Sequence, residues 1–475
     1  MRSGLFALAA SFFAGSMNAA AEEASRADVE SEARAMFERL IAFPTVAGRG
    51  AVPKMAGYLA SELMSAGFDR SDIEIMPLGE TAALIVRYRG EPSSKKKPAL
   101  FLAHMDVVEA RREDWDFDPF VLTEKDEVFY GRGVVDNKYG VLTLTQAFMR
   151  LKREGFVPDR DLILAFSGDE ETNMQTTRML AEELKDAAFA VNSDAGGGYR
   201  PAAGAPGAYG VQAAEKTYAT FEITALNEGG HSSAPRADNA IYELAGALKK
   251  IETLRFPARW NSVSLAAFAA IAPTLDGDLK AAVERFVAKP GDRKALKVMS
   301  ADPSTDRDLR TTCVATMLRG GHAENALPQT ATATINCRIF PGDPVDEVRA
   351  TLARAVANDN LKIETLGEPL ESPVSDIPAE VSEAIAEVVR ARMPGSVISP
   401  YLEAGGTDGL HFRRAGVPTV GAGPIISLES DEYNFHGKNE RFPTARFYDG
   451  LDHFVIFIKA LSGGLAVEGA AKTRN

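Results

Sequence analysis

The chain has 475 residues, of which 45% are hydrophobic and 25% are charged, a composition typical of globular proteins. This length exceeds one ordinary hydrophobic core and predicts two domains. The formal net charge of -13 argues against nucleic acid or an anionic membrane as a partner, because both need basic patches. The sequence has no GxxxxGK[ST] phosphate loop, no CxxC pair and no apolar run long enough to span a bilayer.

The amino terminus has the pattern of a secretory signal. Arg2 precedes an apolar stretch at residues 5–14, and small residues at 18–21 come before the acidic Glu22 and Glu23. This order predicts a signal peptide, residues 1–21, with cleavage after Ala21. The mature protein is then expected to be secreted, or periplasmic in a Gram-negative bacterium. The alternative is a helical or disordered segment that stays attached.

Strands and helices alternate along the first part of the chain. Buried-type apolar runs predict strands at residues 72–76, 82–88, 99–104, 162–166 and 188–192. Apolar residues at helical spacing predict helices at residues 29–43, 55–68, 139–153 and 176–184. This alternation predicts an α/β domain with a mostly parallel sheet and helices on both faces. A stretch rich in Gly, Ala and Pro, residues 196–210, is interpreted as the segment by which the chain leaves this domain.

A different pattern begins near Thr217. Strand, helix, two strands, helix and strand follow at residues 218–226, 239–251, 311–318, 330–339, 345–356 and 361–366. This order predicts a smaller α+β lid domain of the split βαβ, ferredoxin-like type. Asp343 is expected to cap the second helix, with Pro344 at its first position. Residues 255–308 do not fit this order and are interpreted as a partly helical insertion.

The first pattern resumes after residue 369, with helices predicted at 378–392 and 442–461, a strand at 417–420 and a loop at 405–409. The larger domain is therefore expected to comprise residues 22–212 and 369–475, interrupted by the lid at 213–368. Cys313 and Cys337 lie in two lid strands joined by a hairpin-length loop. A cross-strand disulfide and two buried thiols are both compatible with this placement.

Chemically active side chains gather where predicted strands of the larger domain end. His104 ends one apolar run, Glu170 and Glu171 follow another, and Asp194 follows a third. Ligands of such sheets bind at the carboxyl ends of strands, so these positions support one shared site. Asp106 is expected to accept a hydrogen bond from the ring of His104 and so select the nitrogen that holds a metal. Taken alone, the two glutamates also fit a solvated helix start.

Asp136 and His436 complete a set that is typical of a metal centre. Two imidazoles and three carboxylates suit a pair of zinc ions with one carboxylate bridging them. Because neighbouring side chains diverge, one of Glu170 and Glu171 can bind metal while the other faces the reacting water.

Several motifs occur in a fixed order over nearly all of the mature chain. They are His104-x-Asp106, Gly131-Arg132-Gly133-x-x-Asp136-x-Lys138, Asp169-Glu170-Glu171, Asp194, Gly229-Gly230-His231-Ser232-Ser233-x-Pro235, Gly406-Thr407-Asp408 and His436-Gly437-x-Asn439-Glu440. Together they resemble the co-catalytic di-zinc family that contains carboxypeptidase S, carnosinase-type dipeptidases, aminoacylase and acetylornithine deacetylase. The resemblance is greatest to carboxypeptidase S and the secreted N-acyl-amino-acid hydrolases related to it.

The resemblance implies a ligand set for two Zn²⁺ ions, although other divalent metals are open. Asp136 would bridge the ions, Glu171 and His436 would complete one site, and His104 and Asp194 the other. In the same way, Asp106 would orient His104, and Glu170 would be the general base. This base would take a proton from the water between the metals and pass it to the leaving amine.

The resemblance also implies that the lid holds the substrate. His231 would polarise the substrate carbonyl, often from a partner subunit in this family, and Asn325 matches a substrate-binding position. Arg338 would bind a free carboxylate, to which a guanidinium is suited by its bidentate geometry, and the loop at Gly406 and Thr407 would add backbone donors. A surface ion pair is the alternative for Arg338, and a purely structural role is the alternative for Asn325. A homodimer through the edge of the lid sheet is expected, unless the insertion blocks that edge.

These inferences predict a secreted metallopeptidase that cleaves dipeptides or C-terminal residues beside a free carboxylate. The alternative within the same chemistry is an N-acyl-amino-acid amidohydrolase. A binding protein without catalysis would lack a base or a ligand, and none is missing. A serine or cysteine hydrolase is disfavoured, since the chain has no GxSxG elbow. Closure of the two domains is expected from the Gly-rich junction.

Overall fold

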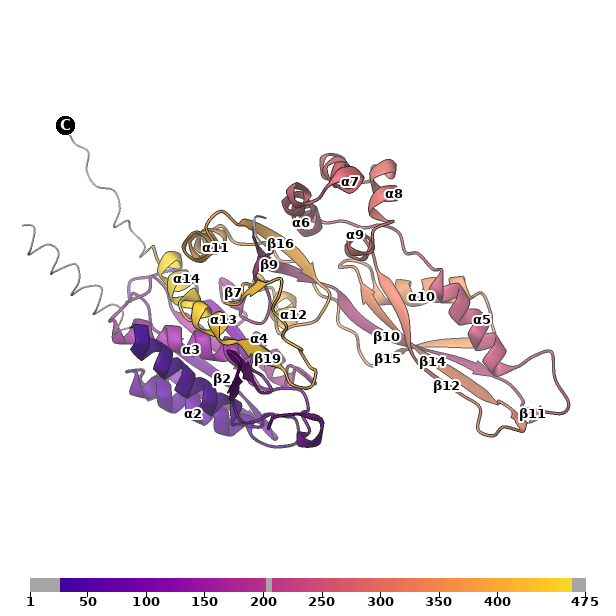
Figure 1. The fold of residues 1–475 in the computed structure, drawn as a ribbon, viewed down its shortest axis with the longest axis horizontal. Coiled ribbons are helices and arrows are strands. Elements are labelled where there is room, and N and C mark those ends of the chain that lie inside the picture. Colours follow the sequence, from indigo (N-terminus) through magenta and orange to yellow (C-terminus); the bar gives the residue numbers. More distant parts are fainter. Residues whose placement is uncertain (1–25, 202–206, 464–475) are drawn as a thin grey trace, which may run out of the picture. The chain divides into compact units, whose positions relative to one another are not determined.

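The computed structural model of the protein describes residues 26–201 and 207–463, which form two compact units (Figure 1). The first unit comprises Met1–Ala202, Ala379–Pro394 and Gly423–Asn475, and the second comprises Ala203–Pro378 and Gly395–Ala422. The expected lid, residues 213–368, falls within the second unit. The expected signal peptide, residues 1–21, lies outside the described residues.

The first unit is built on strands in the order β1-β2-β6-β3-β7. They are β1 (Ile73–Leu78), β2 (Thr81–Tyr88), β6 (Leu162–Ser167), β3 (Ala99–His104) and β7 (Phe189–Asn192). β3 runs parallel to both β6 and β7, whereas β2 pairs antiparallel with β1 and with β6. Every residue of β3 and β6 is buried, as expected for apolar strands covered on both faces. The sheet is therefore mixed, and its parallel centre ends at His104.

The unit also contains seven α-helical segments in the described residues. They are residues 26–41, α2 (Val52–Ser65), α3 (Lys138–Arg153), α4 (Gln175–Glu183), α11 (Ala379–Arg392), α13 (Thr444–Gly450) and α14 (His453–Leu461). α2 and α3 contact the sheet and each other, while α14 packs against α3 and α11 (Figure 1). Short strands complete the unit: β4 (Thr123–Lys125), β5 (Val128–Tyr130), β8 (Gly197–Arg200), β18 (Ile426–Leu428) and β19 (Arg441–Pro443).

The prediction of a single helix over residues 442–461 is wrong. The chain first pairs β19 with β5 and then forms two helices, α13 and α14. Helix α13 ends at Gly450. A Cβ atom at this position would lie 2.0 Å from the phenolic oxygen of Tyr139. The Tyr139 hydroxyl also donates a 2.6 Å hydrogen bond to the main chain of Phe447, so this tight contact holds the chain at the break.

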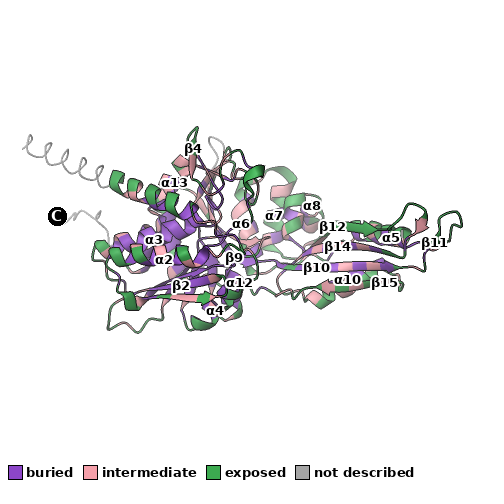
Figure 2. Cartoon of the chain, turned by 90° about the horizontal axis from the view of Figure 1, so that it is seen from below, coloured by how far each residue is buried: buried purple, intermediate pink, exposed green. Residues whose placement is uncertain are grey.

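The second unit contains a four-stranded antiparallel sheet in the order β12-β14-β10-β15. The strands are β12 (Thr312–Gly320), β14 (Thr330–Ile339), β10 (Thr217–Leu226) and β15 (Leu361–Leu366), and α5 (Ala240–Glu252) and α10 (Val345–Val356) pack on them. Along β10 and β14, buried residues alternate with less buried ones (Figure 2). The core therefore lies between one face of the sheet and the two helices, including Phe221, Leu244, Ile335 and Leu352.

One detail of this unit differs from expectation, and another decides a point that the sequence left open. Pro344, not Asp343, occupies the cap position of α10, because Asp343 instead accepts hydrogen bonds from Arg259 and Thr311. Of the two arrangements open for the cysteines, the structure has the disulfide, with Cys313 and Cys337 directly opposite each other on β12 and β14.

The rest of the second unit was only partly predicted. β9 (Ala208–Glu215) starts inside the presumed exit, runs parallel to β16 (Val397–Glu403) and pairs antiparallel with β17 (Thr419–Gly421). The expected insertion is helical, with α6 (Ser262–Ile271), α7 (Gly277–Ala288), α8 (Arg293–Met299) and α9 (Pro303–Asp308) around a core of its own. The remaining elements are α12 (Gly409–Arg414) and the two-stranded pair β11 (Gly230–His231) and β13 (Ala326–Leu327). Within the described ranges, no helix combines the length and apolar character needed to cross a membrane.

Candidate metal centre

Five sequence-predicted ligands meet in the first unit, and we call them the His–carboxylate cluster: His104, Asp136, Glu171, Asp194 and His436. His104 is the last residue of β3, Glu171 follows β6, and Asp194 follows β7. Since β3 is parallel to both neighbours, the carboxyl ends of these three strands lie at one edge of the sheet. Asp136 precedes α3, and His436 lies in the loop after β18.

Asp136 stands between the two imidazoles. Its Oδ1 atom is 3.0 Å from Nε2 of His104, and its Oδ2 atom is 3.1 Å from Nε2 of His436. Each imidazole also faces a second carboxylate: Nε2 of His436 is 3.1 Å from Oε1 of Glu171, and Nε2 of His104 is 3.5 Å from Oδ1 of Asp194. The cluster therefore has two halves, each with one imidazole and one terminal carboxylate, that share Asp136.

The electrostatics of the cluster favour positive charge at both imidazoles. Burial disfavours charged His104, but the charge of Asp194 and the nearby carboxylates of Asp106 and Asp136 raise its pKa well above the ordinary value. Hydrogen bonds with Asp136 and Glu171 raise the pKa of His436 to about 10. Burial opposes ionisation of Asp136, yet its bonds to the two histidines hold its pKa below the usual range.

This donor set fits two divalent cations. In the cluster, carboxylate oxygens face imidazole nitrogens and so favour a proton between them. The same carboxylates and imidazoles bind zinc when the proton is lost. In particular, donor atoms of His104, Asp136 and Glu171 all lie within 4.8 Å of one another. The division into two halves around Asp136 matches a pair of ions with one bridging carboxylate.

Asp106 acts differently from the expectation. Nδ1 of His104 donates to the main-chain oxygen of Asp106 at 3.1 Å, whereas the nearest carboxylate oxygen of Asp106 is 3.6 Å away. That carboxylate instead accepts hydrogen bonds of 3.1 and 3.0 Å from the main-chain N–H groups of Glu170 and Glu171. Asp106 thus orients His104 through its main chain and holds the two glutamates through its side chain. Glu170 itself is largely buried.

Glu440 is a functional residue to which sequence reasoning assigned no role. It is completely buried, and its carboxylate accepts hydrogen bonds from Arg132 at 2.7 Å and from the main-chain N–H groups of Gly133, Val135 and Asp136. Arg132 also donates to the main-chain oxygen of Gly437. This pair therefore ties the loop of Asp136 to the loop of His436. The sequence signal that pointed to Glu440 was its position in the motif His436-Gly437-x-Asn439-Glu440.

The loop of His436 is held in an uncommon conformation. Asn434, His436 and Asn439 have φ angles of 58°, 57° and 54°, in the left-handed region that side chains other than glycine seldom adopt. Asn439 exchanges two hydrogen bonds with Asp116, and Asn434 donates to the main chain of Lys438. These bonds stabilise the turn that directs His436 at Asp136.

Asn137 supports the opposite half of the cluster and was likewise not singled out. Its amide nitrogen donates to Oδ1 of Asp194, and its amide oxygen accepts a 3.2 Å hydrogen bond from the hydroxyl of Ser193. The orientation of Asp194 is therefore set by a buried amide that is itself fixed.

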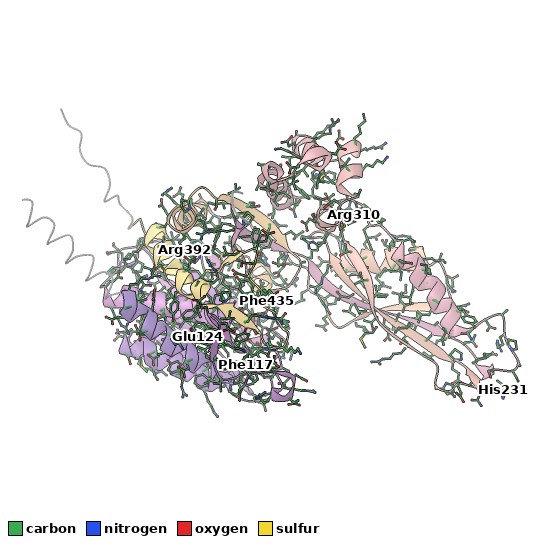
Figure 3. All side chains as sticks on the ribbon, viewed as in Figure 1. Phe117, Glu124, His231, Arg310, Arg392 and Phe435 are labelled. Carbon is green, nitrogen blue, oxygen red and sulfur yellow. A yellow bond between two sulfur atoms is a disulfide. The ribbon has the colours of Figure 1, made fainter. Side chains whose placement is uncertain are left out.

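The residues expected to bind substrate all lie in the second unit. His231 and Asn325 are brought together by the β11–β13 pair, where the N–H of Ser232 donates to the main-chain oxygen of Asn325 at 3.0 Å. Both residues are exposed, and His231, on β11, is labelled in Figure 3. The two predicted lid residues thus lie at the same two-stranded pair, although their segments are far apart in the chain.

Arg338 lies near the predicted Gly-rich loop. It donates a 2.8 Å hydrogen bond from Nη1 to the main-chain oxygen of Ala404, two residues before Gly406. The alternative of a surface ion pair is wrong for the described chain, in which no carboxylate lies within ion-pair distance of Arg338. A half-buried guanidinium without a counter-ion is suited to receive an anion.

Thr407 is buried and uses its side chain internally. Its hydroxyl donates to Glu215 at 3.1 Å and accepts from the N–H of Gly409 at 3.1 Å. Glu215 is itself buried and paired with Arg413 at 2.8 Å. Thr407 therefore fixes the loop, while Gly406 is the exposed residue at its tip.

Comparison with known proteins agrees with this geometry. The sequence profile of peptidase family M20/M25/M40 matches residues 100–460. The chain is 28% identical over 358 residues to the human N-fatty-acyl-amino acid synthase/hydrolase PM20D1, covering 73% of this chain and 70% of that protein. It is 26% identical over 396 residues to the probable carboxypeptidase S-like 2 of Dictyostelium discoideum, covering 79% of this chain and 74% of that protein.

Solved structures have the same fold. The metallo-carboxypeptidase Sso-CP2 of Sulfolobus solfataricus has a TM-score of 0.66 at 18% identity and covers 91% of this chain and 99% of its own. Human carnosine dipeptidase 1 has a TM-score of 0.64 at 17% identity, and the match covers 92% of this chain and 98% of the dipeptidase chain.

Proposed function

Because the chain belongs to peptidase family M20/M25/M40, we propose that it is a secreted di-zinc hydrolase that cleaves an amide bond beside a free carboxylate. The observation that carries the proposal is Asp136, whose two oxygens face the imidazoles of His104 and His436 at 3.0 and 3.1 Å. Asp136 would bridge the ions, with Glu171 and His436 completing one site and His104 and Asp194 the other. When bound, the ions would polarise the scissile carbonyl and acidify water.

Glu170 is proposed as the general base. Its main-chain N–H donates to the carboxylate of Asp106, as does that of the next residue, the proposed ligand Glu171. Its carboxylate would take a proton from the attacking water as the water oxygen bonds to the carbonyl carbon. The carbon–nitrogen bond then breaks, and Glu170 gives the proton to the amine nitrogen. Neither atoms nor charge is left over, since the products are a carboxylic acid and an amine.

The second unit supplies groups suited to the substrate's carboxylate and carbonyl. Arg338 offers unpaired N–H donors, Gly406 offers an exposed backbone, and His231 offers an exposed imidazole. This combination favours substrates with a free carboxylate on the amine side of the scissile bond.

Dipeptides and peptides cleaved at the C-terminal residue are the substrates we propose first. The similarity to proteins described as N-fatty-acyl-amino acid synthase/hydrolase favours N-acyl amino acids as the second candidate. Purified, zinc-loaded protein should be tested on matched panels of dipeptides and N-acyl amino acids, with kcat/KM as the readout. Turnover of acylated substrates alone would reject the peptidase proposal, and turnover of neither would reject the function.

Secretion is also a proposal. The Cys313–Cys337 disulfide supports it, because disulfides persist in oxidising compartments. Fractionation of the source cells should recover mature protein, beginning near Glu22, outside the cytoplasm. Intact protein that begins at Met1 in the cytoplasm would contradict the proposal.

We further propose a homodimer through β12. This strand is at the edge of its sheet and exposes Val314, Met317 and Leu318, the last with 66% of its surface accessible. Unpaired edges with apolar side chains are sites of strand-to-strand association. Light scattering should give twice the monomer mass of the mature chain, and Leu318→Lys should halve that mass. A monomeric native protein would overturn the proposal.

A further inference from the structure

Tyr218 is a large aromatic residue with no evident structural need for its position. It lies on β10 with 55% of its surface exposed, and in the described chain it packs against no other aromatic ring. Burial of its ring therefore contributes little to the free energy of unfolding, since that contribution scales with the area removed from water. Another feature must account for its place.

That feature is Arg338. The two residues are direct partners in the antiparallel register of β10 and β14, so their side chains project from the same face of the sheet. The guanidinium carbon of Arg338 is 4.7 Å from the centroid of the Tyr218 ring, within the range of a cation–π contact. Nη1 of Arg338 is at the same time bonded to Ala404. The guanidinium is thus restrained by a ring and a carbonyl, both of them uncharged groups.

We propose that Tyr218 is a positioning residue for carboxylate recognition. Its ring supports the guanidinium of Arg338 in one orientation and leaves the remaining N–H groups available for a substrate carboxylate. A flexible arginine loses rotamer freedom when it binds, and prior restraint reduces that entropic cost. An acidic partner would restrain Arg338 equally well, but it would compete with the substrate for the positive charge. The inference rests on the proposed function in one respect, namely that the substrate has a free carboxylate.

The test compares an acid with its amide. N-acetyl-L-methionine and N-acetyl-L-methioninamide are titrated calorimetrically into the full-length, zinc-loaded wild type and into Tyr218→Ala, Tyr218→Phe and Arg338→Ala. Tyr199→Ala, which truncates another exposed tyrosine, is the matched control. We expect Tyr218→Ala to weaken binding of the acid about three- to tenfold and to leave binding of the amide unchanged. Tyr218→Phe retains the ring and should stay within about twofold of the wild type.

Unchanged acid binding in Tyr218→Ala, or an equal loss for acid and amide, would overturn the inference. Equal binding of acid and amide by the wild type would also overturn it, while hydrolysis of the substrate panel would still support the proposed function. Conversely, a wild type that prefers the acid but hydrolyses neither panel would refute the proposed function alone. In active protein, Tyr218→Ala should raise KM and leave kcat unchanged, a split that a merely structural defect would not produce.

Discussion

The two units prepare charged groups for ligands in opposite ways. In the first unit, the imidazoles of His104 and His436 are compensated by carboxylates within the cluster. In the second, the guanidinium of Arg338 is held by the Tyr218 ring and the Ala404 carbonyl and has no carboxylate partner in the described chain. A cation must therefore displace protons from the cluster, whereas an anion can approach Arg338 without breaking an ion pair. The first arrangement suits tightly bound metal, and the second suits exchangeable substrate.

Each unit also contains a buried ion pair that fixes a loop. Glu440 and Arg132 join the loops of the cluster, and Glu215 and Arg413 hold Thr407 beside Gly406. Such pairs add little net stability compared with apolar packing, but removal of one partner leaves a buried charge uncompensated. The two units therefore share one way of fixing a loop, although the ligand-facing groups differ.

Removal of metal should have the largest effect of the four changes. It should abolish the function of the first unit's cluster while leaving Arg338 of the second unit able to bind a carboxylate. After chelation we expect amide hydrolysis to fall by at least about 1000-fold, because Lewis-acid stabilisation is worth several kcal/mol. Added Zn²⁺ should restore it. Calorimetric binding of N-acetyl-L-methionine is the control and should survive in part, since Arg338 needs no metal. Full activity in protein shown by elemental analysis to be metal-free would refute the zinc proposal.

The next largest effect is expected for Glu170→Gln. Loss of the general base should lower kcat by about 10²- to 10⁴-fold while zinc content stays at the wild-type value. Glu182→Gln, at an exposed glutamate, is the control and should retain full activity. Wild-type kcat in Glu170→Gln would assign the proton transfer to another residue.

Glu440→Gln tests the buried pair behind the cluster. Arg132 would keep its charge without a carboxylate, so the free energy of unfolding should fall by about 3–5 kcal/mol in urea titrations. Glu182→Gln breaks the exposed pair with Lys185 and should cost less than about 1 kcal/mol. Equal losses of the free energy of unfolding in the two variants would show that burial of the Glu440–Arg132 pair does not increase the cost of breaking it.

The smallest of these four effects is expected for Arg338. Arg338→Ala should raise KM for carboxylate substrates about 10- to 100-fold with kcat little changed, because a charge-assisted hydrogen bond is lost. Arg338→Lys keeps the charge but not the bidentate fork, so it should recover only part of the loss. A fall in kcat at constant KM would place Arg338 in the chemical step instead.

Elements with a strong local signal were predictable. Apolar runs and helical spacing identified β3, β6, α3, β10 and α10, because burial imposes a period on the sequence. β9 was missed because it begins in a Gly- and Ala-rich stretch, and the break between α13 and α14 was missed because it depends on contact with Tyr139. Such contacts leave no trace in the hydrophobic pattern of the segment itself.

By itself, the sequence determined which residues form the His–carboxylate cluster, since they stand at the ends of apolar runs and in ordered motifs. The tertiary structure alone decided which atoms meet and what holds them, such as Nε2 of His436 on the carboxylate of Asp136, 300 positions away. It also decided that the Asp106 carboxylate supports the glutamates, that Glu440 joins two loops and that Tyr218 stacks on Arg338. The reason is physical: side-chain contacts depend on distances and angles that folding sets between distant segments, and residue spacing along the chain does not encode them.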